Sequence, residues 1–253
     1  LKDAGHILGS ASVKVQANEN GNVRTLVYSG DIGPKGTPIL KDLESFKSAD
    51  FVLMESTYGG RLHRERMASV KEMGEIFASA WESGGNVLIP AFAVGRTQEI
   101  FYWFAKHWDD WGLAKWKIFL DSPMASKVVE VYGRHEELYD EEAIELFNSN
   151  PHPFRLPNLQ FTSDVEDSKA INIHKGGCII IAGSGMCNGG RIRHHLLHNL
   201  GHAKNHILFV GYQAGGTLGR LLVDGVPMVK LFGDEIKVKA RRHTIGGLSA
   251  HTD

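Results

Sequence analysis

The sequence predicts an α/β fold, in which a parallel β-sheet is covered on both faces by helices. Between residues 63 and 223, short apolar runs alternate with stretches of helical spacing, a pattern typical of strands joined by helical crossovers. Strand-like segments without intervening helices stand before and after this region. We therefore expect a β-rich framework at each end of the chain, with an α/β unit inserted between the two.

The β-rich framework is predicted from apolar and β-branched segments that polar or glycine-bearing turns separate. Near the N-terminus we expect strands at residues 11–16, 24–29 and 51–54. Residues 228–244 are expected to return to short strands, separated at Gly233 and Asp234.

In the α/β unit each expected helix follows a strand of the buried type. The expected strands cover residues 86–90, 117–121, 178–182 and 207–210. The expected helices cover residues 63–83, 96–108, 190–199 and 217–223. Ser122 and Pro123 predict the first residues of a further helix, and Ser163 with Glu166 predicts a capping box for a helix through Ile173.

Composition restricts the class of protein. The 253 residues, 42% of them hydrophobic, suffice for one large domain or two modest ones. A net charge of −1 excludes a broadly basic surface for nucleic acid, so phosphate contacts must come from local clusters. Two cysteines give no disulfide framework, and neither a signal peptide nor a long apolar span is present. We expect a cytoplasmic protein without membrane contact and, because the chain starts at Leu1, a segment of a longer one.

Two short stretches predict a metal site. His6 and Asp31 each follow a strand-like segment and each stand beside glycine, so their side chains are expected to project from a rigid edge. Imidazole and carboxylate are the ligands that hydrolytic zinc centres use. Alone, such residues are more often parts of ordinary turns, and the metal interpretation therefore depends on motifs further along the chain.

Three glycine-bearing loops predict a cleft that binds phosphate. Residues 90–99, 182–191 and 211–220 each lie between an expected strand and an expected helix, and they carry Arg96, Arg191 and Arg220. Helix N-termini favour anions, and guanidinium groups bind phosphate oxygens in fork geometry. A turn with a solvated arginine explains any one loop, but three parallel cases favour the phosphate cleft.

Two further motifs identify a family resemblance. Glu55-Ser56-Thr57-Tyr58-Gly59 and Leu248-Ser249-Ala250-His251-Thr252-Asp253, together with His6, Asp31 and the 183–191 loop, occur in one order along the chain. This set resembles the β-CASP branch of the metallo-β-lactamase fold, and in particular its RNA-processing ribonucleases. The resemblance implies a partial metallo-β-lactamase αββα framework at residues 1–58 and 236–253, with an inserted β-CASP domain, a parallel sheet flanked by helices, at residues 59–235.

The resemblance also implies roles for individual residues. His6 is expected to bind one zinc ion and Asp31 to bridge two. Glu55 matches an acid beside the metals that orients ligating imidazoles. His251 matches the histidine that meets the scissile phosphate and protonates the leaving oxygen, so the expected catalytic residues are Asp31, Glu55 and His251. The remaining expected substrate-binding residues are Arg96, Ser184, Gly185, Arg191 and Arg220.

The sequence departs from the family pattern in its metal ligands. The family's His-x-His-x-Asp-His run is absent from these residues, as is its last histidine motif, and Leu248 stands where an aromatic residue is usual. Two of seven expected ligands remain. We therefore expect two Zn²⁺ ions in a complete active site, and we expect this chain alone to bind zinc weakly and to cleave nothing.

The predicted function is zinc-dependent hydrolysis of phosphodiester bonds in single-stranded RNA, in RNA processing or decay. One alternative is a non-catalytic β-CASP scaffold subunit, against which the presence of His6, Asp31, Glu55 and His251 argues. Another is a DNA nuclease of the Artemis-like group, and a small-molecule hydrolase is disfavoured by the large inserted unit. Endo- or exonuclease action, RNA sequence preference and a homodimer stay open.

Overall fold

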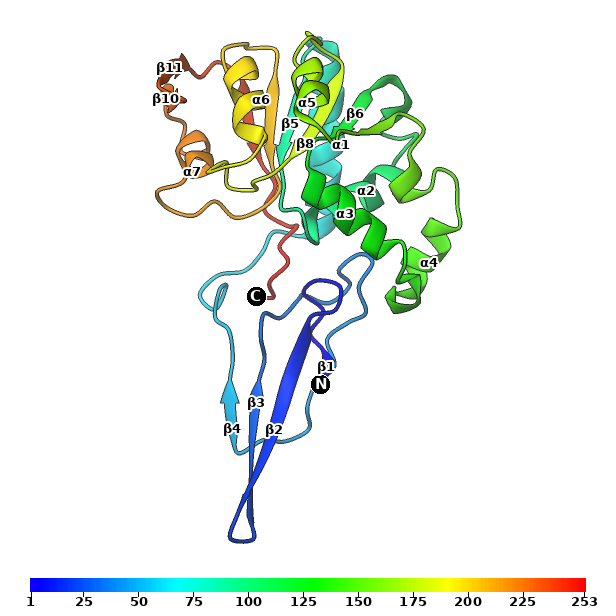
Figure 1. Ribbon diagram of the computed structural model, residues 1–253, viewed down its shortest axis with the longest axis vertical. Coiled ribbons are helices and arrows are strands. Elements are labelled where there is room, and N and C mark those ends of the chain that lie inside the picture. Colours follow the sequence, from blue (N-terminus) through cyan, green and yellow to red (C-terminus); the bar gives the residue numbers. More distant parts are fainter.

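The structure is a computed structural model that describes residues 1–253. It has two parts: an α/β body, and a narrow arm of long strands that projects from the body (Figure 1). The N-terminus and the C-terminus both lie where the arm meets the body (Figure 1). Residues from opposite ends of the chain therefore approach each other at this junction.

The body is built on a six-stranded sheet of order β12-β9-β5-β8-β6-β7, in which every neighbouring pair is parallel. Its strands are β5 (Val87–Pro90), β6 (Lys117–Leu120), β7 (Leu159–Phe161), β8 (Cys178–Ala182), β9 (His206–Phe209) and β12 (Arg241–Thr244). All residues of β5, β8 and β9 are buried, as expected for a parallel sheet with both faces covered.

Successive side chains of a strand point to opposite faces of the sheet, and in the central strands both sets are buried, so helices cover both faces. Val87 and Ile89 pack into a core of 34 buried residues with the helices α1 to α4, whereas Leu88 packs into a core of 12 with α6 and α7. The helices are α1 (Arg66–Glu82), α2 (Arg96–Lys106), α3 (Pro123–Tyr132), α4 (Glu141–Phe147), α5 (Val165–Ile171), α6 (Ile192–Asn199) and α7 (Leu218–Val223), with short 3₁₀ helices at Leu113–Lys115, Glu136–Leu138 and Pro153–Arg155.

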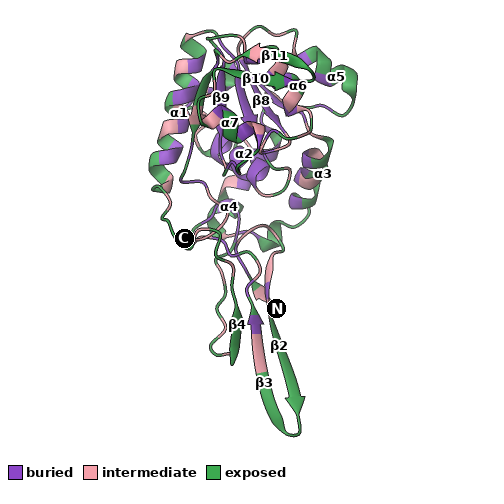
Figure 2. Cartoon of the chain, turned by 90° about the vertical axis from the view of Figure 1, so that its left-hand side faces the viewer, coloured by how far each residue is buried: buried purple, intermediate pink, exposed green.

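The arm is a second sheet of order β1-β2-β3-β4. Its strands are β1 (Lys2–Asp3), β2 (Ala11–Glu19), β3 (Asn22–Tyr28) and β4 (Phe51–Leu53). Most of the arm is exposed, including the apolar residues Val15, Val23 and all of β4 (Figure 2). A separate hairpin joins β10 (Met228–Leu231) to β11 (Asp234–Lys237) beside α7.

The predicted α/β class is confirmed, and every predicted strand and helix forms with its bounds shifted by a few residues. Ser122 caps α3 as predicted, because its Oγ accepts a hydrogen bond from the backbone N–H of Ala125 at 3.2 Å. The predicted cap of α5 is wrong. Asp164, not Ser163, is the N-cap, and its carboxylate accepts a hydrogen bond from the N–H of Asp167 at 2.8 Å. A carboxylate there also complements the positive end of the helix dipole.

The division of the chain at residue 236 stays a prediction. Strand β12, which the sequence assigned to the terminal framework, pairs with β9 and forms an edge of the body's sheet. Only the segment after β12 leaves the sheet and reaches the arm, where the N–H of Thr252 bonds to the carbonyl oxygen of Ile32. None of the helices is both long enough and apolar enough to pass through a membrane.

Candidate active site

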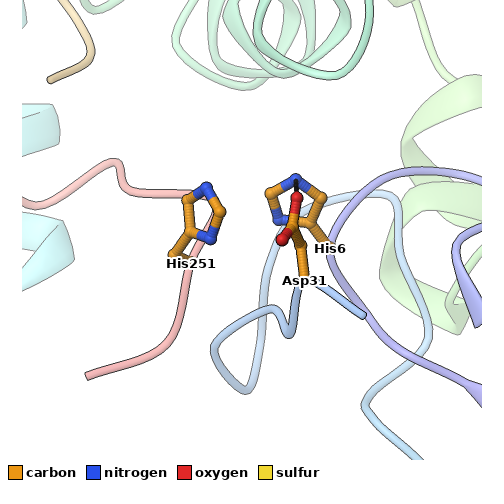
Figure 3. Close-up of side chains that lie close together, drawn as sticks. All are labelled: His6, Asp31 and His251. Carbon is orange, nitrogen blue, oxygen red and sulfur yellow. Dashed lines mark ion pairs between the residues drawn. The ribbon is translucent and has the colours of Figure 1, made fainter. Parts of the chain in front are cut away.

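His6, Asp31 and His251 converge where the arm meets the body. His6 lies in the turn between β1 and β2, Asp31 follows β3, and His251 stands near the C-terminus. Their candidate ligand atoms all lie within 4.8 Å of one another (Figure 3). The structure thus brings together three of the residues that the sequence marked as metal-binding or catalytic.

Two local interactions, a turn closed by Ser10 and the close approach of Gly33, place His6 beside Asp31. The hydroxyl of Ser10 accepts hydrogen bonds from the N–H groups of His6 and Ile7, at 3.1 and 3.2 Å, and this closes the turn that carries the imidazole. Gly33 fits against the same turn, since a Cβ atom there would lie 1.7 Å from the carbonyl oxygen of Gly5. Only glycine allows the loop after Asp31 to approach this closely.

A hydrogen bond fixes the orientation of the His6 ring. Its Nδ1 lies 2.7 Å from the carbonyl oxygen of Ala250, which can only accept, so the proton is on Nδ1. In the neutral ring Nε2 then carries a lone pair, and Nε2 faces Oδ2 of Asp31 at 3.8 Å, beyond hydrogen-bond distance. Two electron-donating atoms therefore face each other across a gap that suits a cation.

Glu55 holds the third member of the cluster. Its Oε2 accepts a hydrogen bond from Nδ1 of His251 at 2.9 Å, and its Oε1 accepts one from the N–H of Ile32. Burial alone would raise the pKa of Glu55, but bonds from Ile32, Thr57 and His251 outweigh it and lower the pKa. The carboxylate thus stays charged, and Nε2 of His251 remains free for substrate or metal.

The donor set fits one metal ion. A catalytic zinc takes about three protein ligands from imidazole and carboxylate groups, and two ligands about 2.1 Å from one ion in tetrahedral geometry lie about 3.4 Å apart. The 3.8 Å separation of His6 Nε2 and Asp31 Oδ2 is close to that spacing. A pair of ions needs more ligands than the three that the chain gathers here.

A cavity of about 590 Å³ adjoins the cluster and is lined by residues of both the arm and the body. His6 and His251 line it, together with Phe92 and Arg96 from the start of α2 and the loop before it. This loop follows the carboxyl end of β5, the end of a parallel sheet where ligands bind in α/β folds. The cavity thus provides space for a substrate beside the candidate metal ligands.

The three loop arginines all have carboxylate partners. Arg96 is buried and pairs with Glu99 within α2. Nη1 of Arg191 lies 2.7 Å from Oδ1 of Asp121, and Arg220 pairs with Asp224 one turn along α7, at 2.8 Å. Of the three arginines only Arg96 lines the cavity. Their binding of phosphate stays a prediction, and a phosphate would have to compete with these carboxylates.

Ser184 and Gly185 make hydrogen bonds that stabilise the 183–191 loop. The hydroxyl of Ser184 accepts a hydrogen bond from the N–H of Gly189 at 3.2 Å. The carbonyl oxygen of Gly185 accepts one from the side chain of Gln213 at 3.0 Å. A Cβ atom at Gly185 would lie 2.9 Å from the ring of Phe92, so glycine lets this half-exposed ring pack on the loop and line the cavity. Their contact with substrate also stays a prediction.

A buried polar network that the sequence did not predict lies behind the 183–191 loop. The Asp121 carboxylate is fully buried and accepts hydrogen bonds from His195 and Ser168, both at 2.6 Å, and from Thr162 and Arg191. Burial alone would raise the pKa of Asp121, but these bonds, led by the one from His195, lower it. The signal in the sequence is an aspartate at the carboxyl end of a buried strand.

Comparisons with known proteins agree with this architecture. Residues 97–222 match the family described as the Beta-Casp domain. The chain is 44% identical to ribonuclease TTHA0252 of Thermus thermophilus, over 98% of this chain and 56% of that protein. It is 30% and 33% identical to the transcription termination factors FttA of Methanocaldococcus jannaschii and Pyrococcus horikoshii, over its whole length and 41% and 40% of theirs.

The chain therefore spans about half the length, or less, of these curated relatives. The matched residues run from the start of α2 to α7 and so include four of the six strands of the body's sheet. Together with the motifs around His6, Asp31, Glu55 and His251, this match confirms the predicted resemblance: the chain carries a β-CASP domain.

Proposed function

We propose that this protein is a metal-dependent ribonuclease that hydrolyses phosphodiester bonds of single-stranded RNA in RNA processing or decay. The observation that carries the proposal is the convergence of His6, Asp31 and His251 beside a cavity of about 590 Å³. The name of the Thermus relative, a ribonuclease, supports RNA as the substrate, and on the same ground we propose that the protein acts in the cytoplasm.

We assign the metal to zinc, with His6 and Asp31 as its ligands. The tautomer that Ala250 imposes leaves Nε2 of His6 as the donor atom, and 60% exposure leaves the Asp31 side chain free to bridge a second ion. Bound zinc would activate a water molecule and polarise a phosphoryl oxygen. The proposed complete site has two such ions, so we expect this chain alone to bind metal weakly and not to cleave RNA.

The role proposed for His251 is proton transfer to the leaving ribose oxygen. Glu55 accepts the Nδ1 hydrogen bond, which fixes the orientation of the ring, and Nε2 is left to face a phosphodiester in the cavity. The same carboxylate also bonds to Ile32, next to Asp31. Glu55 thereby fixes the position of the proton donor relative to the loop that carries a metal ligand.

Two other functions fit the site less well. A non-catalytic scaffold has no need of a charged carboxylate held against an imidazole at the edge of a cavity, yet Glu55 and His251 form this pair. A DNA nuclease would use the same groups, and matched RNA and DNA substrates separate the two.

The test uses the complete product of the gene that encodes this chain. Cleavage of single-stranded RNA and of DNA of the same sequence is measured with and without zinc, for the parent protein and for His251→Ala. We expect zinc-dependent cleavage of RNA, and a rate about 10² to 10⁴ times lower in the variant.

Zinc content is expected to be the same in both proteins. Exposed His202→Ala is the matched control. Undiminished cleavage by His251→Ala would remove its role, and equal or preferential cleavage of DNA would contradict the substrate assignment.

A further inference from the structure

A second hollow, of about 270 Å³, continues the active-site cavity along the junction of arm and body. Both hollows are lined by Tyr58, Gly211, Tyr212 and Ser249, so they meet at these residues. The lining of the second hollow contains no aspartate or glutamate. It contains three arginines: Arg61, Arg64 and Arg220. Arginine side chains that line a hollow can bind phosphate groups when their charge is not already paired.

Arg61 differs from the other two arginines of this hollow. Arg64 pairs with Glu72 and Arg220 with Asp224, but Arg61 makes no ion pair with a carboxylate and is exposed. Its guanidinium lies 4.6 Å from the ring centre of Tyr58 and 5.1 Å from that of Tyr212. The charge of Arg61 thus stays available to a phosphate while two aromatic faces hold the group in place.

The two tyrosines come from different parts of the chain. Tyr58 belongs to the segment that follows Glu55, on the arm side, and Tyr212 follows β9, on the body side. Tyr212 is 46% exposed and lines both hollows, so it is accessible to a base beside Arg61. An exposed aromatic face beside a free guanidinium matches what single-stranded RNA offers, a stackable base followed by a phosphate.

We propose that Tyr58, Arg61 and Tyr212 form a subsite for the single-stranded RNA segment that leaves the active-site cavity. A base stacks on Tyr212, and the adjoining phosphate binds Arg61. The inference rests on RNA as the substrate and assigns the path of its chain beyond the cavity. Stacking reads no base identity, so the subsite adds affinity for any sequence long enough to reach it.

The experiment measures binding of the 253-residue chain to a mononucleotide and to an RNA oligomer of about eight nucleotides, a length within the range of single-strand sites. Tyr212→Leu removes the ring, Tyr212→Phe keeps it, and Arg61→Gln removes the charge. Lys14→Gln, at an exposed lysine of β2, controls for the general effect of charge. Thermal unfolding of each variant shows whether it keeps the fold.

We expect Tyr212→Leu to weaken binding of the oligomer about tenfold, while Tyr212→Phe and Lys14→Gln bind it like the parent. Arg61→Gln is expected to lower the slope of log affinity against log salt by about 0.7, the value for one phosphate contact on a single strand. Mononucleotide binding is expected to be unchanged in every variant.

Parental oligomer binding by both Tyr212→Leu and Arg61→Gln would overturn the subsite and leave the ribonuclease proposal intact. Equal loss for mononucleotide and oligomer would also overturn it, because the effect would then lie in the cavity. If the parent chain binds no RNA of either length, the subsite is wrong, and the cleavage assay on the complete gene product judges the proposed function separately.

Discussion

Oε2 of Glu55 lies 2.9 Å from Nδ1 of His251, and Oε1 of the same carboxylate accepts a hydrogen bond from the N–H of Ile32. Because Ile32 follows Asp31, this one side chain connects the C-terminal segment to the loop that carries a candidate metal ligand. Glu55 therefore fixes the position of His251 relative to the loop of Asp31 in the proposed site.

Replacing Glu55 tests this connection. Glu55→Gln keeps the size of the side chain but removes the charge that orients His251, so we expect RNA cleavage by the complete gene product to fall about ten- to a hundredfold. Zinc content is expected to stay the same, because Glu55 is not a proposed ligand. Exposed Glu75→Gln on α1 is the control. Parental cleavage rates in Glu55→Gln would show that the pair has no catalytic part.

Gly33 offers a second test, of the backbone that places the ligands. Gly33→Ala would put a Cβ atom 1.7 Å from the carbonyl oxygen of Gly5, so the loops of His6 and Asp31 must move apart. We expect zinc affinity, measured by calorimetry, to fall at least tenfold. Gly60→Ala, where a Cβ atom would meet nothing within 4 Å, is the matched control. Equal affinities in the two variants would contradict this account.

Asp121 predicts an acid-sensitive core. Its pKa is lowered in the folded protein, so its contribution to stability is present above the unfolded pKa of about 4 and is lost as the pH falls below that value. We expect Asp121→Asn to lower the free energy of unfolding by about 3 kcal/mol at pH 7, because Arg191 loses its charge partner and buried His195 loses the carboxylate that it contacts. Urea unfolding from pH 7 to pH 3 measures both effects. A variant as stable and as acid-sensitive as the parent would refute the prediction.

His206 predicts a loss of stability at mildly acidic pH. It is fully buried, with its Nδ1 3.0 Å from Nε2 of His243, and burial, followed by the charges of His243 and Arg241, lowers its pKa to about 4. The unfolded chain binds this proton near pH 6.5. The free energy of unfolding therefore decreases by about 2 to 3 kcal/mol as the pH is lowered from about 6.5 to 4.

Urea unfolding at pH 7 and pH 5 checks this expectation. His206→Gln is expected to lose much of the difference in stability between the two pH values, whereas exposed His202→Gln keeps it. An equal pH dependence in parent and His206→Gln would show that another group titrates in this range.

The sequence predicted the body well because its signals are local. Strands β5 and β8 are continuous apolar runs that follow asparagine or glycine, and α3 begins at Pro123 after its N-cap Ser122. Apolar runs and capping chemistry therefore place these elements. Helix α4 was missed because it has only seven residues, four of them apolar, between two polar turns. The edge position of β12 was missed because its pairing with β9 is a long-range choice.

The candidate site was predicted from motifs, but its geometry was not. Sequence order marked His6, Asp31, Glu55 and His251. The hydrogen bonds from His6 to Ala250 and from Ile32 to Glu55, however, join these side chains to backbone atoms, which carry no residue signature. The carboxylate partner of Arg191 carried no local signal either, since Asp121 lies 70 residues from it. Such contacts exist only once the chain has folded.

A zinc titration of the 253-residue chain, followed by calorimetry, tests the central claim most directly. We expect one zinc ion per chain, at least tenfold weaker binding by His6→Ala and by Asp31→Ala, and parental binding by exposed His135→Ala. Zinc binding with the parental affinity and stoichiometry in both ligand variants would contradict it.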